Sequence, residues 1–477
     1  MAARDALSEL WRAADLPSAA LPFVTLTGAD PVVASSFAVG AAAQSAVSAA
    51  ALAAAQIGWL RNGLGQTIKV DMREAALEAF CHFSVDGKTP ELWDKLAGVY
   101  RCQSGGQAGA WVRVHTNFAH HRDALLRLLG LPSGSEVTRE QVAQSLLLWD
   151  AFALEEAAAD GGALVAAYRT EDEWQAHPQS AALAALEVVS IEKIGDAPAL
   201  EWPELKLTER PLSKLRVLEL TRILAGPVAG RTLAAYGADV MLVNSPHLPN
   251  IDAIIDTSRG KMSALADLRQ PADRAALDAA LAQAHVFIQG YRPGSLANLG
   301  YSAEAIAQKR PGIVVVSLSA YGETGPWGNR RGFDSLVQTA CGLNHQEALA
   351  YADHDANATS QRQPHLPPRA LPMQILDVAS GFLMAFGAQA ALIRQQREGS
   401  SWQVRVSLAR TAQRLRELGR VDRGFIAAKP DFSGLLETSC SGYGELMASR
   451  HSAHFSHTPA AWDKPSMPPG SHPLRWG

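Results

Sequence analysis

Cysteine is scarce in this sequence, and its four cysteines are scattered. Cys81, Cys102, Cys341 and Cys440 show no C-x-x-C spacing. This argues against a disulfide framework or a cysteine-based zinc site and favours a reducing compartment. Charge is also low: 19% of residues are charged and the net charge is −4. This net charge does not favour nucleic acid or an anionic membrane as a partner. An anionic ligand would therefore need a local basic cluster.

The sequence also lacks a hydrophobic run of the membrane-spanning kind. Residues 31–60 carry no charge but are mostly Ala, Ser and Gly, which supply little transfer free energy. This composition predicts a buried helix rather than a membrane span. Residues 1–15 mix acids with bases and have no apolar core, unlike a signal peptide. We expect a cytoplasmic protein that does not contact the membrane.

Several common catalytic motifs are absent. The apolar run 217–220 is followed by TRILAGP rather than G-x-G-x-x-G, and no P-loop, H-E-x-x-H pair or G-x-S-x-G elbow occurs. His451, His454 and His457 have no acidic or cysteine partner beside them, so we expect a solvated tail and no metal site. ATPase, zinc-protease and serine-hydrolase functions lose most of their support.

Strand and helix patterns alternate in the middle of the chain. Short apolar runs at 217–220, 238–243, 285–290 and 312–320 are separated by helical segments. Such βαβ units predict a parallel sheet covered by helices, with right-handed crossovers. The expected fold class is therefore α/β, with a Rossmann-like parallel-sheet domain and a second, smaller mixed α/β domain.

The sequence predicts three regions. Residues 1–205 are expected to form the smaller domain, and residues 206–419 the Rossmann-like half. Residues 420–477 are rich in Gly, Ser, Pro and His, with little periodicity, so we expect an irregular tail. A faint internal repeat pairs residues 32–72 with residues 377–408, each a small-residue helix, a glycine turn and a strand.

Ordered motifs over residues 213–410 resemble one known family. They are LRVLELTRILAGPVAGRTLAAYGADVMLVNSP (215–246), DTSRGKMSALADL (256–268), VFIQGYRPGSLANLGYS (286–302) and VVVSLSAYGETGPWGNRRGFDSLVQTACGL (314–343). This set resembles the class III (CaiB/BaiF) CoA-transferases. The resemblance implies that family's fold and the transfer of coenzyme A from an acyl-CoA to a small carboxylic acid. It also implies coenzyme A and acyl-CoA as substrates, no permanently bound cofactor, and an interlocked homodimer.

A coenzyme A site needs basic groups and close backbone approach near its phosphates. Arg222, Arg292 and Arg331 each follow a predicted strand, where a cleft forms in a parallel sheet. The turn at Ala225 and Gly226 allows close backbone approach, since glycine has no side chain. We expect these five residues to bind coenzyme A, although each arginine taken singly is as well explained as a surface charge.

The resemblance implies that Asp377 is the nucleophile, because it opens a small-residue helix that leads to the strand SWQVRVSL. An aspartate of ordinary pKa, about 3.9, is ionised at neutral pH. The competing interpretation is an N-cap for that helix. The strand departs from the family pattern at Trp402 and Arg405. Asp353 and Asp355, in the polar segment 345–372, are poorer candidates.

The resemblance also implies that Phe333 and Asp334 shape the active site; Asp334 is equally well explained as an N-cap of the following helix. Racemases of the same superfamily are the enzymatic alternative, but their base is a histidine where this chain has Phe333. A coenzyme A-binding paralogue without turnover is a third possibility. Leu224 and Asn244 replace residues that are often polar or acidic in the family. The resemblance therefore does not predict how the acyl group is bound.

The order of the two halves is reversed relative to the family, which suggests a permuted and duplicated chain. Depending on the alignment, Gly40, Ala41 or Val32 stands opposite Asp377 in the first repeat. None is a carboxylate, although Asp30 is close. The sequence therefore predicts one active site per chain.

Overall fold

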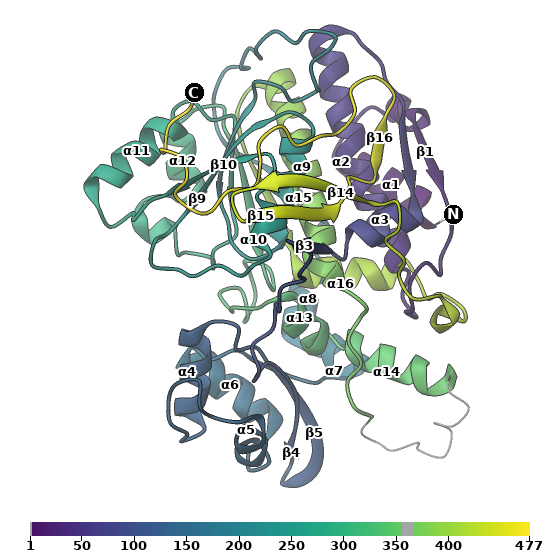
Figure 1. Cartoon of the computed structure of the whole chain (residues 1–477), viewed down its shortest axis with the longest axis vertical. Coiled ribbons are helices and arrows are strands. Elements are labelled where there is room, and N and C mark those ends of the chain that lie inside the picture. Colours follow the sequence, from purple (N-terminus) through teal and green to yellow (C-terminus); the bar gives the residue numbers. More distant parts are fainter. Residues whose placement is uncertain (1, 355–365) are drawn as a thin grey trace.

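The computed structural model describes residues 2–354 and 366–477 and shows two lobes of unequal size (Figure 1). The larger lobe is built around a seven-stranded sheet. The smaller lobe contains a three-stranded sheet and lies below the larger one in that view. Both ends of the chain lie on the larger lobe.

The seven strands are arranged in the order β10-β9-β8-β11-β12-β13-β7. Neighbours from β10 to β13 are parallel, and only the edge strand β7 is antiparallel to its neighbour. Their bounds are Ser190–Gly195 (β7), Arg216–Leu220 (β8), Asp239–Asn244 (β9), Lys261–Leu265 (β10), Val286–Gln289 (β11), Val314–Ser319 (β12) and Ser401–Ser407 (β13). The predicted parallel-sheet α/β fold is confirmed.

Helices cover both faces of this sheet. In β8, Val217 belongs to the core beneath α9 and α15, whereas the next residue, Leu218, packs with α11 and α12. This alternation follows from the period of two along a strand, and it explains why the strands are apolar on both faces. The helices of this half are Ala225–Ala235 (α9), Ile254–Thr257 (α10), Pro271–Leu281 (α11), Ala297–Leu299 (η2), Ala303–Lys309 (α12), Asp334–Ala340 (α13), Leu343–His354 (α14), Ile375–Glu398 (α15) and Leu408–Glu417 (α16).

Helix α15 is long and apolar enough to cross a membrane, the only such helix among the residues described. Its apolar stretch is entirely buried inside the protein. It packs against α2 (Val39–Asn62), α9 and the sheet. Its hydropathy is therefore that of a central core helix. The uncharged run at 31–60 likewise folds mainly into the buried helix α2.

The smaller lobe has a core of its own. Its antiparallel sheet consists of β4 (Gly98–Ser104), β5 (Gln107–Val114) and β6 (Val165–Ala167). Helices α4 (Ala119–Leu128), α5 (Arg139–Leu146) and α6 (Ala151–Gly161) cover it and share a separate cluster of buried apolar side chains. Helix α13 packs against β5 and β6, so the smaller lobe is joined to the sheet half at this helix.

Residues 1–205, expected to form one domain, are divided between the lobes. The first part packs on the larger lobe as α1 (Ala2–Ala13), η1 (Ser18–Phe23), β1 (Val24–Thr27), α2, β2 (Ile68–Asp71), α3 (Met72–Glu78) and β3 (Phe83–Val85). The chain then forms the smaller lobe and returns through α7 (Glu171–Gln175) and α8 (Pro178–Ala184). Packing against α15 decides the place of α2, and local sequence pattern does not reveal such a contact.

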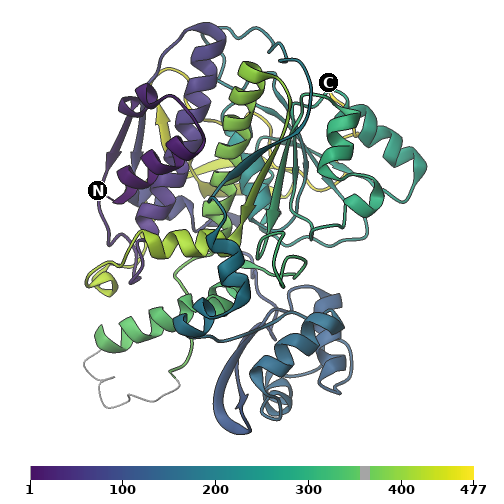
Figure 2. The ribbon, with the colours of Figure 1, turned by 180° about the vertical axis from the view of Figure 1, so that it is seen from behind.

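The internal repeat has a structural counterpart in α2 and α15, which run side by side (Figure 2). Each helix has 24 residues. Their N-caps, Ala38 and Gln374, share nearly the same backbone angles, with φ of −77° and −79° and ψ of 58° and 61°. Each helix leads through a glycine C-cap to a strand and another helix: β2 and α3, or β13 and α16. Counting from the N-caps places Ala41 opposite Asp377.

The two repeat units exchange strands. In the first unit, β2 is flanked by β1 in parallel and by β16 (Ala453–Phe455) in antiparallel orientation. In the second, β13 is flanked by β12 in parallel and by β7 in antiparallel orientation. The chain that follows the first unit supplies β7 to the second, and the chain that follows the second supplies β16 to the first. The two units are therefore interlocked within one chain.

The C-terminal region is more ordered than the sequence predicted. Residues 420–477 contain η4 (Gly424–Ile426), β14 (Leu436–Ser441), β15 (Gly444–Ser449) and β16. Strands β14 and β15 form a tight hairpin that pairs with β3. His451 is not in a solvated tail: it is buried, and its ring bonds to Glu78 and Tyr236. These strands are short, and only alternate side chains such as Leu446 and Ala448 are buried, so their apolar signal is weak.

Candidate active site

Asp377 lies in the first turn of α15 and lines a cavity of about 260 Å³. The walls come from three distant segments. Phe80 belongs to the N-terminal region, Trp93 to the approach to the smaller lobe, and Leu224 to the turn after β8. The N-cap of α15 is Gln374, so the N-cap interpretation of Asp377 does not hold. Among the residues described, none donates a hydrogen bond to its carboxylate.

Asp334 is fully buried beside Asp377 and accepts a 2.9 Å hydrogen bond from the backbone N–H of Asp377. It also accepts a bond from Gln338 Nε2 at 2.5 Å. Of the two interpretations of Asp334, the N-cap of α13 does not hold, because Phe333 occupies that position and Asp334 is the first helical residue. Its carboxylate instead fixes the start of α15.

Burial makes ionisation of both carboxyl groups less favourable. Burial raises the pKa of Asp377 well above its ordinary value, and the nearby Asp334 raises it further. Burial also raises the pKa of Asp334, to about 6, although hydrogen bonds from Asp377 and Gln338 oppose that shift. The ordinary pKa expected for Asp377 is therefore wrong. Its environment favours the protonated form of the carboxyl group.

The three arginines expected to bind coenzyme A lie around one cavity of about 320 Å³. Arg222 follows β8, Arg292 follows β11, and Arg331 lies in the loop after β12. These strands are neighbours in the sheet, so their carboxyl ends bring the guanidinium groups together. Burial lowers the pKa of Arg331, as does the neighbouring charge of Arg292. No Asp or Glu is found among the described residues that line this cavity, so it favours an anion.

Three cavities follow one another along this edge. The arginine cavity shares Ile223 and Phe333 with the Asp377 cavity. On its other side it shares Leu248, Tyr291 and Ser295 with a mainly apolar cavity of about 290 Å³ that Asn244 also lines. A long ligand can therefore run from an apolar end, past cations, to a buried carboxylate.

Ala225 and Gly226 do not reach these cavities within the part of the chain described. They open α9 and are buried. A Cβ atom on Gly226 would lie 2.5 Å from Cγ2 of Thr221, so this glycine allows the start of α9 to pack closely against the residue that follows β8. The expected close approach to a ligand is therefore replaced by a close approach to Thr221.

His115 is a site residue that the sequence did not reveal. It directly follows β5, is 5% exposed, and lines the Asp377 cavity. Its ring stacks on Phe333 with centroids 4.2 Å apart. Burial, helped by the charge of Arg113, lowers the pKa of His115 to about 3, so the ring is neutral. Only the folded smaller lobe brings this position to Asp377, and no motif surrounds it.

The segment 345–372, expected to be a loop, begins as part of α14. Asp353 lies in this helix and lines none of the three cavities, as far as the chain is described. Asp355 lies outside the described residues. Asp377 is therefore the carboxylate that the described structure places in the cavity.

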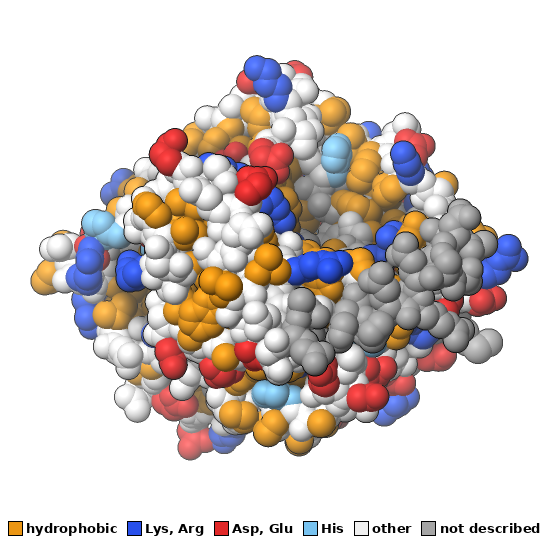
Figure 3. Space-filling model, turned by 90° about the horizontal axis from the view of Figure 1, so that it is seen from below, with side chains coloured by type: hydrophobic (Ala, Val, Ile, Leu, Met, Phe, Trp, Pro, Cys, Tyr) orange, Lys and Arg blue, Asp and Glu red, His pale blue; other side chains and the backbone are white. Residues whose placement is uncertain are grey.

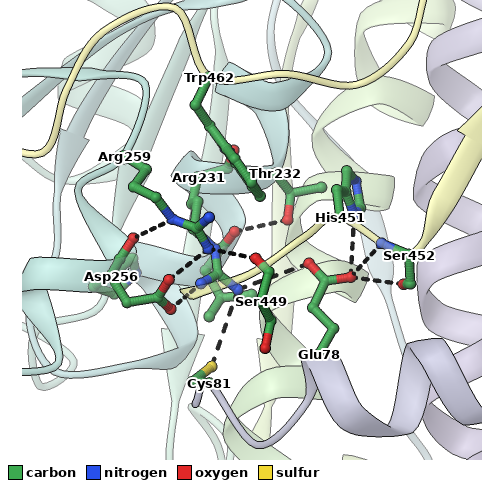
Figure 4. A network of polar contacts seen from close by, with 12 residues as sticks. Glu78, Cys81, Arg231, Thr232, Asp256, Arg259, Ser449, His451, Ser452 and Trp462 are labelled. Atoms are coloured by element: carbon green, nitrogen blue, oxygen red, sulfur yellow. Dashed lines mark hydrogen bonds and ion pairs between the residues drawn. The ribbon is translucent and has the colours of Figure 1, made fainter. Parts of the chain in front are cut away.

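A buried ionic network stands behind the cavity wall (Figure 4). Arg231 of α9 lies between Asp256, with which it is paired, and Glu78 of α3, 3.9 Å away. Its Nη2 atom is 4.0 Å from the sulfur of Cys81, which lines the Asp377 cavity. His451 binds Glu78 at 3.1 Å. Burial opposes ionisation of Glu78, but His451 and Arg231 outweigh it and lower the pKa to about 2. The network joins three regions of the chain.

The outer surface mixes acidic, basic and apolar side chains on the face seen in Figure 3. This distribution agrees with the small net charge of −4. Among the described residues, Arg222, Arg292, Arg330 and Arg331 cluster around the arginine cavity.

Comparison with known proteins confirms the predicted resemblance. Residues 212–421 match CoA-transferase family III. An acyl-CoA transferase of Gibberella moniliformis is 28% identical over 72% of this chain and 64% of its own length. A succinate–glutarate CoA-transferase of Agrobacterium fabrum is 30% identical over 42% of this chain and 51% of its own. A crystal structure of a CaiB/BaiF family protein from Brucella suis is 25% identical, with a TM-score of 0.37, over 50% of this chain and 65% of that one. The chain thus spans only about half to two thirds of the length of such relatives.

Proposed function

From the match of residues 212–421 to CoA-transferase family III, we propose that this chain transfers coenzyme A from an acyl-CoA to a carboxylic acid. The reaction runs through a thioester on Asp377. The observation that carries the proposal is the position of this buried carboxylate at the end of a row of three cavities, the middle one of which is lined by four arginines: Arg222, Arg292, Arg330 and Arg331. Residues 206–419 supply most of this site, and the smaller lobe closes it.

Coenzyme A fits this row by its chemistry. Its adenine would occupy the apolar cavity beside Tyr291, and its phosphates would lie among Arg222, Arg292 and Arg331. The pantetheine arm would pass Ile223 and Phe333 to reach Asp377. Ala225 and Gly226 would act indirectly, by fixing the turn after β8.

The proposed chemistry has four balanced steps. The Asp377 carboxylate attacks the acyl-CoA carbonyl, giving a mixed anhydride and coenzyme A thiolate. The thiolate attacks the Asp377 carbonyl of that anhydride, which forms the aspartyl-CoA thioester and releases the donor acid. The acceptor carboxylate then attacks this thioester, giving a second anhydride and the thiolate. Finally the thiolate attacks the acceptor carbonyl, which yields the new acyl-CoA and frees Asp377.

Asp334 serves as a positioning residue in this scheme. It binds the N–H of Asp377 and holds the first turn of α15 in place. Because this N–H is already used, it does not stabilise an oxyanion. Phe333 separates the two cavities and supports His115.

A homodimer was expected from the resemblance alone. The two interlocked units inside the chain offer a different solution, because each sheet already receives its exchanged strand. We propose that one chain is sufficient to form the site, with Asp377 as its single nucleophile. The chain would act in a reducing, cytoplasmic compartment, since all four cysteines are free.

Trapping the intermediate tests this proposal. The enzyme is incubated with an acyl-CoA and treated with hydroxylamine, and peptides are analysed by mass spectrometry. A hydroxamate on Asp377, absent in Asp377→Ala, is expected. No adduct with any of a broad panel of acyl-CoA thioesters and acids, together with tight coenzyme A binding, would indicate a binding protein without turnover.

A racemase remains the second candidate because of one observation: the His115 ring stacks on Phe333, the position where the racemase base would stand. A neutral ring of low pKa is a weak base, so transfer is favoured. Exchange of the α-hydrogen of a 2-methylacyl-CoA in deuterium oxide, without coenzyme A transfer, would favour the racemase over the transferase.

A further inference from the structure

The wall of the Asp377 cavity is mostly hydrocarbon and aromatic. Its apolar side chains come from all three regions that meet there: Phe80, Leu92, Trp93, Phe118, Leu224 and Met373. Polar groups are fewer and include Asp377 itself, His115 and Ser335. Burying an alkyl or aryl group against such a wall is favourable in proportion to its area.

No Lys or Arg is found among the described residues that line this cavity. The cation that acts on the nearby Asp334 is Arg113, which lies behind the wall with its guanidinium carbon 5.4 Å above the Trp93 ring. A second carboxylate on the substrate would therefore lose its hydration without gaining a cationic partner. That loss is costly in an apolar site.

Two residues of the cavity lining, His115 and Ser335, each carry a buried polar atom that has no hydrogen-bond partner among the described residues: Nδ1 of His115 and the hydroxyl of Ser335. Both residues are at least 95% buried, with exposures of 5% and 3%. Leaving such groups unpaired costs free energy that a bound oxygen atom would recover. A neutral imidazole has one N–H to donate.

We infer that this cavity takes an acyl group with a single carboxyl carbon and an apolar body, and that His115 and Ser335 bind the carboxyl oxygens. This inference rests on the proposed function and specifies its substrate class. Cavities of about 150 Å³ hold benzene, so 260 Å³ suits a body of up to about ten non-hydrogen atoms. The Agrobacterium fabrum relative is named for two dicarboxylic acids, so the chain would differ from it in substrate.

Binding to Asp377→Asn tests the substrate class apart from turnover. Calorimetry would compare hexanoyl-CoA with glutaryl-CoA, which has a similar length but ends in a carboxylate. We expect hexanoyl-CoA to bind at least about tenfold more tightly. Equal or tighter binding of glutaryl-CoA would overturn the inference even where wild-type enzyme transfers coenzyme A. A clear hexanoyl preference without any turnover would instead leave it standing and remove the proposed function.

A variant that adds a cation to the cavity wall tests the same substrate preference. Leu92→Arg places a guanidinium in the half-buried wall, and we expect it to reduce the preference for hexanoyl-CoA at least about fivefold. Leu148→Arg is the matched control, because Leu148 is 80% exposed on the smaller lobe. An unchanged preference in folded Leu92→Arg would contradict the proposed lack of a cationic partner.

His115 is tested by two substitutions that separate shape from hydrogen bonding. His115→Phe keeps an aromatic ring against Phe333 but removes the donor, whereas His115→Gln keeps a donor. We expect transfer by His115→Phe to fall at least about tenfold with unchanged affinity for free coenzyme A, and His115→Gln to recover part of the loss. Equal activity in wild type and His115→Phe would show that the imidazole does not bind the substrate.

Discussion

The backbone N–H of Asp377 donates a 2.9 Å hydrogen bond to the buried carboxylate of Asp334. The contact fixes the turn that carries the proposed nucleophile. It also places a second acidic group where it opposes ionisation of the first. Asp334 therefore affects both the position of Asp377 and, in addition to burial, its ionisation, and the two effects can be separated by substitution.

The first prediction concerns pH. Burial and Asp334 raise the pKa of Asp377. Because the ionised form of Asp377 is the proposed nucleophile, kcat/KM should rise with pH through that raised pKa. Asp334→Asn keeps an oxygen that can accept the Asp377 N–H but removes the negative charge. It should shift the rising limb of the profile toward lower pH. A limb that does not move would show that Asp334 has no electrostatic effect on the nucleophile.

The second prediction concerns stability. A carboxyl group whose pKa is higher in the folded than in the unfolded state holds more protons when folded, so stability falls as pH rises above the unfolded value of about 4. Asp377→Asn removes this penalty. Its Tm should exceed that of wild type by a few degrees at pH 8, and the gap should shrink toward pH 4.5. Thermal unfolding at both pH values checks this; a gap independent of pH would contradict the raised pKa.

The third prediction concerns the arginine cavity. Arg331→Ala and Arg292→Ala should each weaken coenzyme A binding about ten- to a hundredfold, the range for a lost charge-assisted contact to phosphate. The loss should be smaller at high salt, because salt screens the remaining charges. Arg397→Ala is the control: Arg397 is a surface residue paired with Asp15 and Glu398. Calorimetric Kd values that match for Arg331→Ala and this control would place the phosphates elsewhere.

The sequence predicted the parallel sheet from apolar runs of strand length. It singled out Asp377 as the candidate nucleophile from a family motif around the helix start. Both depend on local pattern. The sequence did not predict His115 or the true partner of Asp334. The position of His115 depends on how the smaller lobe docks on α13, and that of the Asp334 partner depends on how α13 packs against the start of α15. Periodicity within a segment does not indicate such contacts between segments. The sequence indicated that Arg222, Arg292 and Arg331 lie near one another, because the carboxyl ends of parallel strands meet at one edge of a sheet; their binding of coenzyme A stays a prediction. The sequence did not show that Gly226 packs against Thr221, because a glycine allows close packing as well as close approach to a ligand.

The fourth prediction follows from the interlocked units. Light scattering of the purified chain should give a monomer of 50.8 kDa, because β7 and β16 complete the two sheets internally. Trapping should label at most one residue per chain, since Ala41 occupies the place of Asp377 in the first unit. Asp30, which accepts the N–H of Ala41 at 3.1 Å, should stay unlabelled. A dimer, or a second label at Asp30, would contradict this account.

The last prediction concerns the network behind the cavity. Glu78 and Arg231 are fully buried, and Glu78 also receives His451 and Ser452. Glu78→Gln removes one charge and leaves a buried cationic excess, so unfolding free energy should fall by about 3–5 kcal/mol.

Glu74→Gln, one turn earlier in α3, is the matched control. Glu74 pairs with the exposed His454, and exposed pairs contribute about 0–1 kcal/mol. Denaturant unfolding of both variants would measure the difference. Because Glu78 binds the C-terminal segment while Cys81 lines the cavity, Glu78→Gln should also weaken acyl-CoA binding, whereas Glu74→Gln should not. Equal stability of the two variants would mean that the network does not hold the three regions together.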